Sequence, residues 1–114
     1  MGNACRLVVS SGTLTNLVLG EMISKLNIEK IVHCTPYRMY GRNNYKWIDV
    51  KEQAYMSFNI GRYVDKILCD IVSLDDCQMI LGRTWQVDVK AINCGWKNEY
   101  VITRDGKKFV MSSL

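Results

Sequence analysis

The sequence of 114 residues contains a single proline and a single histidine, and it lacks repeats and low-complexity segments. Its apolar runs are a few residues long, whereas a membrane-spanning helix needs ~20. One histidine and the absence of any C-x-x-C pair leave no pattern of zinc ligands. We therefore expect one soluble domain over residues 1–114, in the cytoplasm or nucleus, with no metal, no cofactor and no membrane partner.

Cysteine is present, but without a pattern of pairs. The five cysteines are an odd number at irregular spacing, at positions Cys5, Cys34, Cys69, Cys77 and Cys94. A disulfide framework favours an even number. Each cysteine has apolar neighbours, as in VHC and ILC, which is typical of small buried thiols. The sequence therefore predicts free thiols in a reducing, intracellular compartment.

Positive charge exceeds negative charge only slightly. The 15 Lys and Arg residues against 11 Asp and Glu give a net charge of +4. The basic residues are scattered, and Lys107-Lys108 is their only adjacent pair. Nucleic-acid footprints cluster on one face, so the pattern favours a solvated surface, and we expect no nucleic-acid partner.

The first third of the chain predicts a strand, a turn and a helix. Residues 5–10, CRLVVS, are typical of a buried strand that runs into a Ser-Ser-Gly turn. Apolar residues then recur at helical spacing, at Leu19, Met22, Ile23 and Leu26. Thr15 or Asn16 would cap this helix, and Gly20 would keep it short and dependent on packing.

From residue 31 onward the apolar period is two, which indicates strands. A turn at residues 41–44 separates residues 31–40 from a long strand at 48–58 that has one wet face. Turns at 59–62 and at Asp105-Gly106 predict two more hairpins. Met79-Ile80-Leu81 predicts a buried strand that ends at Gly82, with one or two helical turns at 84–90.

Two strand-turn-helix segments occur along the chain in an order that is typical of one protein family. An apolar strand ends in Ser-Gly-Thr and leads to a helix, and about seventy residues later Ile80-Leu81-Gly82 is followed by Arg-x-Trp and a short helix. This layout resembles the retropepsins, the single-domain aspartic proteases of retroelements, above all those of plant gypsy-type retrotransposon polyproteins. Between these two features the family has a flap hairpin and a stretch similar to FNIGRYVDKILCDIV, and its second strand continues as GRPWQFD, similar to GRTWQVD here.

The resemblance covers nearly the whole chain, because the tail GWKNEYVITRDGKKFVMSSL is similar to the family's closing hairpin. It implies a mainly β fold: a small closed acid-protease barrel with a flap hairpin and one or two short helices. It also implies a homodimer in which terminal strands, here residues 5–8 and 109–114, pair between subunits; a reduced interface would leave a weak dimer or a monomer.

The sequence departs from the family at the catalytic position. Ser11, Gly12 and Thr13 match the second to fourth positions of the family's Asp-Ser-Gly-Thr loop, and Ser10 stands in place of the catalytic aspartate. Aspartic proteases use two carboxylates about 3 Å apart that share a proton. A serine hydroxyl holds no negative charge near neutral pH, and losing a general base costs ~10²–10⁴ in rate. We expect no peptide hydrolysis.

Other residues offer no clear replacement for the lost acid. Asp75, Asp76 and Asp88 are predicted to be solvated loop acids. Ser10 or Ser11 paired with His33 would be a serine-type alternative, but such a site needs a positioned base and a third orienting group. A structural role for His33 is the favoured interpretation.

The predicted flap is also altered. Lys46 stands where relatives commonly have a glycine at the tip, although Asn43 and Asn44 are able to make the turn, since Asn tolerates positive φ. Tyr45 and Trp47 are candidate flap aromatics that contact a ligand, and cross-strand packing is an equal alternative.

Three functions follow from these observations. The first is a retroelement-derived pseudoprotease that binds a peptide or protein partner without cutting it. The second is an active-site mutant of a genuine aspartic endopeptidase, and the third is a nucleic-acid-binding or structural module. The missing acid favours the first.

Overall fold

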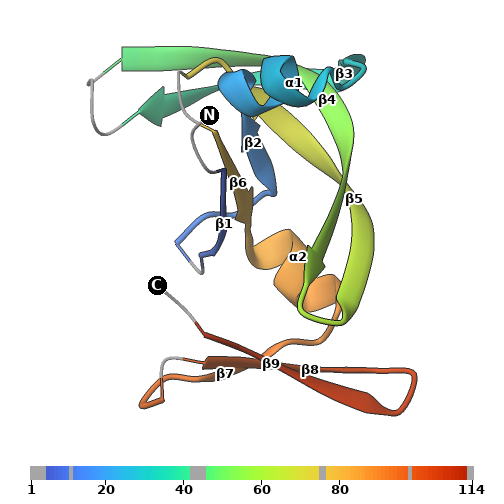
Figure 1. Ribbon diagram of the computed structural model, residues 1–114. Coiled ribbons are helices and arrows are strands. Elements are labelled where there is room, and N and C mark those ends of the chain that lie inside the picture. The colour runs from blue at the N-terminus through green and yellow to red at the C-terminus, as the bar shows by residue number, and fades with distance from the viewer. Residues whose placement is uncertain (1–4, 11, 42–45, 75–76, 98, 113–114) are drawn as a thin grey trace.

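The computed structural model describes residues 5–10, 12–41, 46–74, 77–97 and 99–112, and every structural statement below concerns these residues. The fold is mainly β, as the sequence predicts, with two short helices (Figure 1). The elements in chain order are β1 Arg6–Val9, β2 Leu17–Leu19, α1 Gly20–Leu26, β3 Ile31–Gly41, β4 Lys46–Ile60, β5 Tyr63–Val72, β6 Gln78–Leu81, α2 Arg83–Asp88, β7 Ile92–Cys94, β8 Glu99–Arg104 and β9 Lys107–Ser112. Neither helix is long and apolar enough to cross a membrane.

The larger sheet brings together the loop after β1 and the end of β6, the two segments of the predicted site. Its strand order is β1-β6-β2-β5-β4-β3, so β6 lies between β1 and β2 although they are neighbours in sequence. β6 runs parallel to β1 and antiparallel to β2. The loop after β1 must therefore pass the end of β6 to reach β2. Strands β1 and β3 form the two ends of this sheet, so the described strands leave it open, and the closed barrel stays a prediction.

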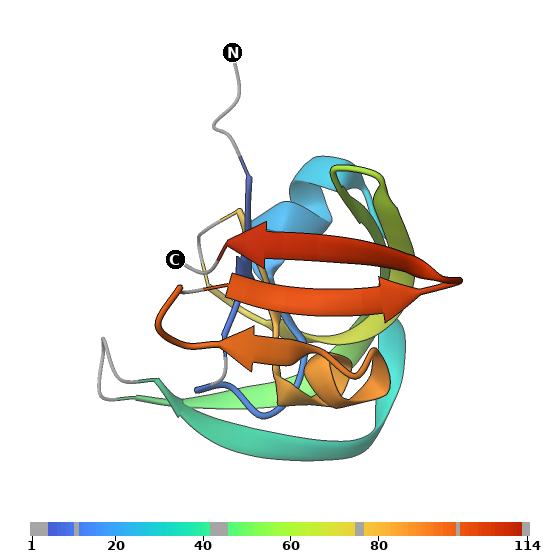
Figure 2. The ribbon, with the colours of Figure 1, turned by 90° about the horizontal axis from the view of Figure 1, so that it is seen from below.

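The second sheet, β7-β8-β9, packs below the first, with α2 between them (Figures 1 and 2). Aromatic rings join the two sheets, because Tyr63 at the start of β5 lies 5.3 Å from Phe109 of β9 and 6.1 Å from Trp85 of α2, centroid to centroid. Asp65 accepts hydrogen bonds from the Tyr63 hydroxyl (2.7 Å) and from Trp85 Nε1 (3.3 Å). Buried side chains from both sheets thus belong to one core.

The period-two pattern of the long central strand is confirmed by burial. Val50, Ala54 and Met56 on β4 are buried, whereas Asp49 and Lys51 are exposed. Alternate side chains of a strand point to opposite faces, so one face of β4 packs on the core and the other meets water. The predicted turns at 59–62 and at Asp105-Gly106 also form, each joining two antiparallel strands.

The predicted start of the first helix is wrong. Leu19 is the N-cap, with extended backbone and no capping side chain, so neither Thr15 nor Asn16 caps α1. Residues 17–19 form β2 instead, and all three are buried. They pair with β5 on one side and β6 on the other, and this tertiary pairing prevails over the helical spacing. The seven-residue helix is short, as Gly20 led us to expect.

The prediction that all five cysteines are free thiols is also wrong, because Cys5 and Cys77 form a disulfide. The parallel pairing of β1 with β6 brings the residues that precede the two strands together, with their Cα atoms 4.6 Å apart. The two cysteines are 72 residues apart in the sequence, so local sequence patterns do not indicate that they are neighbours. Cys34 is exposed, Cys94 is partly buried and Cys69 is buried, and these three are free.

Candidate functional site

The loop after β1 and the loop after β6 are held together by backbone hydrogen bonds. The Ser10 amide donates to the Leu81 carbonyl (3.0 Å), the Arg83 amide to the Thr13 carbonyl (2.8 Å) and the Thr84 amide to the Leu14 carbonyl (3.0 Å). Segments about seventy residues apart in the sequence therefore form one junction, and Ser10 is at its start. We call residues 10 and 12–16, together with 82–84, the loop junction.

Gly82 allows this close approach. Its amide donates to Asn16 Oδ1 (3.0 Å), which explains why Asn16 is buried. A Cβ atom at position 82 would lie 2.8 Å from the carbonyl oxygen of Thr13 and closer still to that of Thr15. Backbone atoms cannot move aside as a side-chain tip can, so only glycine fits here. Ile80 and Leu81, which precede it, belong to β6.

Ser10 has ordinary hydroxyl contacts. Its Oγ atom accepts from the Gly12 amide (3.3 Å) and from Thr13 Oγ1 (3.4 Å), and its carbonyl accepts from Gln86 Nε2 (3.0 Å). Among the described residues, none of the hydrogen bonds to Ser10 comes from an acid or a histidine. Ser11 lies outside the described residues, so the loop as described offers hydroxyls and amides but no carboxylate.

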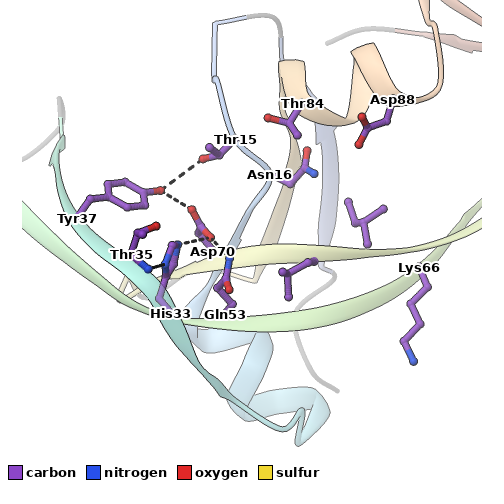
Figure 3. Close-up of a pocket in the computed structure, with 12 residues that line it drawn as sticks. Thr15, Asn16, His33, Thr35, Tyr37, Gln53, Lys66, Asp70, Thr84 and Asp88 are labelled. Carbon is purple, nitrogen blue, oxygen red and sulfur yellow. Dashed lines mark hydrogen bonds and ion pairs between the residues drawn. The ribbon is translucent and has the colours of Figure 1, made fainter.

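A pocket of about 580 Å³ lies beside the loop junction (Figure 3). It is bounded by Thr15 and Asn16 of the loop junction, by the middle of β3, by β4 and β5, and by α2. Thr15 Oγ1 lies 3.5 Å from the Tyr37 hydroxyl, which links the junction to β3 across the pocket. Asp88, predicted to be a solvated acid, is exposed at the end of α2 and lines the same pocket.

The centre of the pocket wall is a buried carboxylate that the sequence reasoning missed. Asp70 of β5 is 6% exposed and accepts from the Tyr37 hydroxyl (2.6 Å) and from Gln53 Nε2 (2.9 Å). His33 Nε2 lies 3.1 Å from its Oδ1 atom. The signal was available, because an aspartate inside the apolar stretch ILCDIV must have partners if it is buried.

Both ring nitrogens of His33 are engaged. Nδ1 accepts the Thr35 amide (3.0 Å), so it carries no proton, and Nε2 carries the proton and donates to Asp70. In the described part of the chain, none of the hydrogen bonds to the Ser10 side chain or carbonyl comes from His33. The geometry supports the structural interpretation of His33 over the serine-type alternative.

Burial and the Asp70 carboxylate raise the pKa values of Tyr37, which lines the pocket, and of Cys69, the residue before Asp70 in the buried strand. Burial, followed by the hydrogen bond to Asp70, raises the pKa of Tyr37 above 10.0. Burial, with a smaller contribution from the Asp70 charge, raises the pKa of Cys69 to about 12. Both groups therefore stay protonated at neutral pH, and neither is an activated nucleophile.

Of the predicted flap residues, Trp47 is described, and Asn43, Asn44 and Tyr45 lie outside the described residues. Trp47 is 59% exposed and faces Tyr40 across the β3–β4 pair, with ring centroids 5.3 Å apart. The Arg38 guanidinium stacks on its ring at 5.5 Å. Trp47 is thus in the cross-strand arrangement that was one of its two expected roles. Asp75 and Asp76 likewise fall outside the described residues.

In the described part of the chain, no three His, Cys, Asp or Glu side chains are grouped to hold a metal ion. No protein-family model matches the sequence, and no curated protein matches it either.

Proposed function

We propose that this chain is a retroelement-derived, retropepsin-like domain that binds an extended peptide or protein segment and does not cleave it. The observation that carries the proposal is the loop junction, in which a strand ending in Ser10-Ser11-Gly12-Thr13 meets a strand ending in Ile-Leu-Gly. The placement of β6 between β1 and β2 supports it as well, because this order forces the two loops to meet. The acid-protease barrel is part of the proposal, with the outer edge of β3 left open.

The absence of cleavage follows from the chemistry of position 10. A peptidase of this type needs one carboxylate that accepts a proton from water and a second that donates one to the substrate carbonyl. A homodimer of this chain would bring together two serines and no acid. Asp70 does not replace them, because its oxygens are already occupied by Tyr37, Gln53 and His33.

Peptide binding rests on the free edge of the larger sheet. Among the described strands, β3 pairs with β4 alone, so its outer edge offers a place for a further strand. Its pairing is irregular between Val32 and Tyr37, a stretch that contains Pro36, and regular from Tyr37 to Gly41. We propose that an extended segment pairs along residues 37–41 and reaches the pocket beside Thr15 and Tyr37.

The cleavage test uses a reduced, alkylated, unfolded polypeptide incubated with the purified protein at acidic to neutral pH. We expect no products from the wild-type chain or from Ser10→Ala, the matched control. Pepstatin-sensitive cleavage by the wild-type chain would overturn the proposal. Cleavage by Ser10→Asp alone would favour the second candidate, a genuine endopeptidase with an altered active site, which the intact Ser-Gly-Thr sequence also supports.

The binding test follows backbone amide signals by NMR while the same unfolded polypeptide is added. We expect shifts at residues 13–16 and 37–41, and none at the distal turn around Gly106. Shifts that spare both expected segments would contradict the assignment of the binding surface. A pocket substitution, Tyr37→Phe, is expected to weaken binding because it removes the hydroxyl shared by Thr15 and Asp70.

A further inference from the structure

The disulfide joins the residues that precede β1 and β6, and so it fixes where β1 begins. Cys5 immediately precedes β1 and Cys77 immediately precedes β6, and the two strands run parallel from there. The Cα separation of 4.6 Å lies within the range of ordinary disulfides. The bond thus fastens the start of β1, and the Ser10 amide, bonded to the Leu81 carbonyl at 3.0 Å, fastens its end.

Among the described residues, β1 is a short strand at the edge of its sheet. It is four residues long, lies at one end of the sheet, and pairs with β6 alone. The side chain of Val9 is buried, those of Leu7 and Val8 are partly buried, and that of Arg6 is exposed and donates to Gln78 Oε1 (3.3 Å). The Arg6 amide donates to the Cys77 carbonyl (2.9 Å), so the backbone contact at the start of the strand depends on the same pair of residues.

We propose that the Cys5–Cys77 bond is a redox-cleavable latch on β1. In the oxidised chain the latch keeps β1 on β6 and holds the start of the loop junction. In the reduced chain β1 detaches from the edge of the sheet, and Ser10 loses its fixed position against Leu81. This proposal concerns the stability of one strand, and it holds or fails independently of the proposed peptide binding.

The reaction is thiol–disulfide exchange with a dithiol reductant. A thiolate of the dithiol attacks the sulfur of Cys5, which is the exposed partner, and the Cys77 thiolate leaves and takes a proton. The second thiol of the dithiol then attacks the mixed disulfide and releases Cys5 as a thiol. The protein gains two thiols, and the dithiol becomes a disulfide. Because Cys77 is 3% exposed, its thiolate is poorly solvated until β1 moves, so reduction and release of the strand are coupled.

The first measurement counts thiols. After unfolding without reductant, we expect alkylation of the three free cysteines only, and of all five after reduction. Alkylation of all five without reductant, in protein previously equilibrated with oxidised glutathione, would overturn the proposal.

The second measurement is amide hydrogen exchange of residues 6–9, followed by mass spectrometry. We expect exchange at least about tenfold faster in the reduced chain than in the oxidised chain, with unchanged exchange in β4 and β5. Cys5→Ser is expected to exchange rapidly with or without reductant, and Cys34→Ser, which removes an exposed free thiol, is expected to respond as the wild type does. Equal exchange rates of the β1 amides in the oxidised and reduced wild-type chain would overturn the proposal. This comparison uses the wild-type chain and does not depend on whether a variant folds.

Discussion

Among single residues, Asp70 and Gly82 shape the site in different ways: Asp70 through its hydrogen bonds and Gly82 through its lack of a side chain. Asp70 is retained in an apolar strand because donors from Tyr37, Gln53 and His33 replace its hydration. Gly82 is needed because a side chain would collide with the backbone of the neighbouring loop. The first residue contributes hydrogen bonds, and the second contributes the absence of a side chain.

Replacing the buried acid tests the first of these roles. Asp70→Ala leaves three donors in a buried wall without their acceptor, and we expect a loss of about 2–4 kcal/mol in the free energy of unfolding. The matched control is Asp49→Ala, which removes an exposed acid paired with Arg38 at 3.3 Å and is expected to cost less than about 1 kcal/mol. Urea denaturation of the two variants measures both values, and equal losses would contradict the role of Asp70.

Replacing the junction glycine tests the second role. Gly82→Ala is expected to cost about 3 kcal/mol or more, because its Cβ atom meets backbone oxygens that have no room to relax. Gly95→Ala serves as the control, since nothing lies within 4 Å of the added Cβ atom, and it should change stability by less than about 0.5 kcal/mol. A stable, unperturbed Gly82→Ala protein would show that the loop junction is looser than described.

At the scale of elements, the hairpins were easier to predict than the helix start. The β8–β9 turn has Asp105 and Gly106, both at positive φ (52° and 75°), which is the geometry of a type I′ turn. The Asp-Gly pair is a local signal that is read without knowledge of the rest of the fold. The start of α1 is different, because β2 exists only through its pairing with β5 and β6.

This turn allows a test at the same scale. Gly106→Ala places a Cβ atom at a φ of +75°, and we expect a loss of about 1 kcal/mol in stability. Asp105→Asn keeps a residue that tolerates the left-handed region, so its unfolding free energy should stay within about 0.5 kcal/mol of the wild type. Thermal denaturation followed by circular dichroism compares the two, and a reversed order would argue against the type I′ geometry.

At the scale of the whole molecule, the pKa shifts set the behaviour of the fold in alkali. Burial raises the pKa of Cys69 from 9.0 to about 12. Burial also raises the pKa of Tyr37 and Tyr63 above 10.0, aided by hydrogen bonds to Asp70 and Asp65 respectively. The folded chain keeps these protons after the unfolded chain has released them. Their contribution to stability is therefore complete below pH about 9 and is lost as the pH rises toward 12.

We therefore expect the free energy of unfolding to fall steadily above pH about 9. The free energy of unfolding of Cys69→Ala should decline less steeply with pH. The substitution removes the group with the lowest ordinary pKa of the three, 9.0, which begins to lose its proton in the unfolded chain at the lowest pH. Cys34→Ala, at an exposed free cysteine, is the matched control and should keep the wild-type slope. Urea titrations at several alkaline pH values give the slopes, and a Cys69→Ala slope equal to that of the wild type would contradict the prediction.

Assembly also belongs to this scale. β1 and β9 are end strands of their sheets and carry most of the described part of the predicted dimer segments, 5–8 and 109–112. Among the described strands, β1 and β9 each pair on one side, and a homodimer through terminal strands would extend their outer edges. Sedimentation over a range of concentrations is expected to reveal a weak dimer. A monomer at every concentration would contradict this prediction.

Local patterns predicted most of the long strands and the hairpin turns, because period-two burial and Asp-Gly geometry are properties of a few neighbouring residues. The sequence also determined that position 10 carries a serine, and hence that the loop lacks a carboxylate there. Long-range contacts set the rest: the disulfide between Cys5 and Cys77, the strand character of residues 17–19, and the contacts of Asp70 with Tyr37, Gln53 and His33. Each of these depends on contacts between segments far apart in the chain, and local patterns carry no record of which distant segment becomes the neighbour.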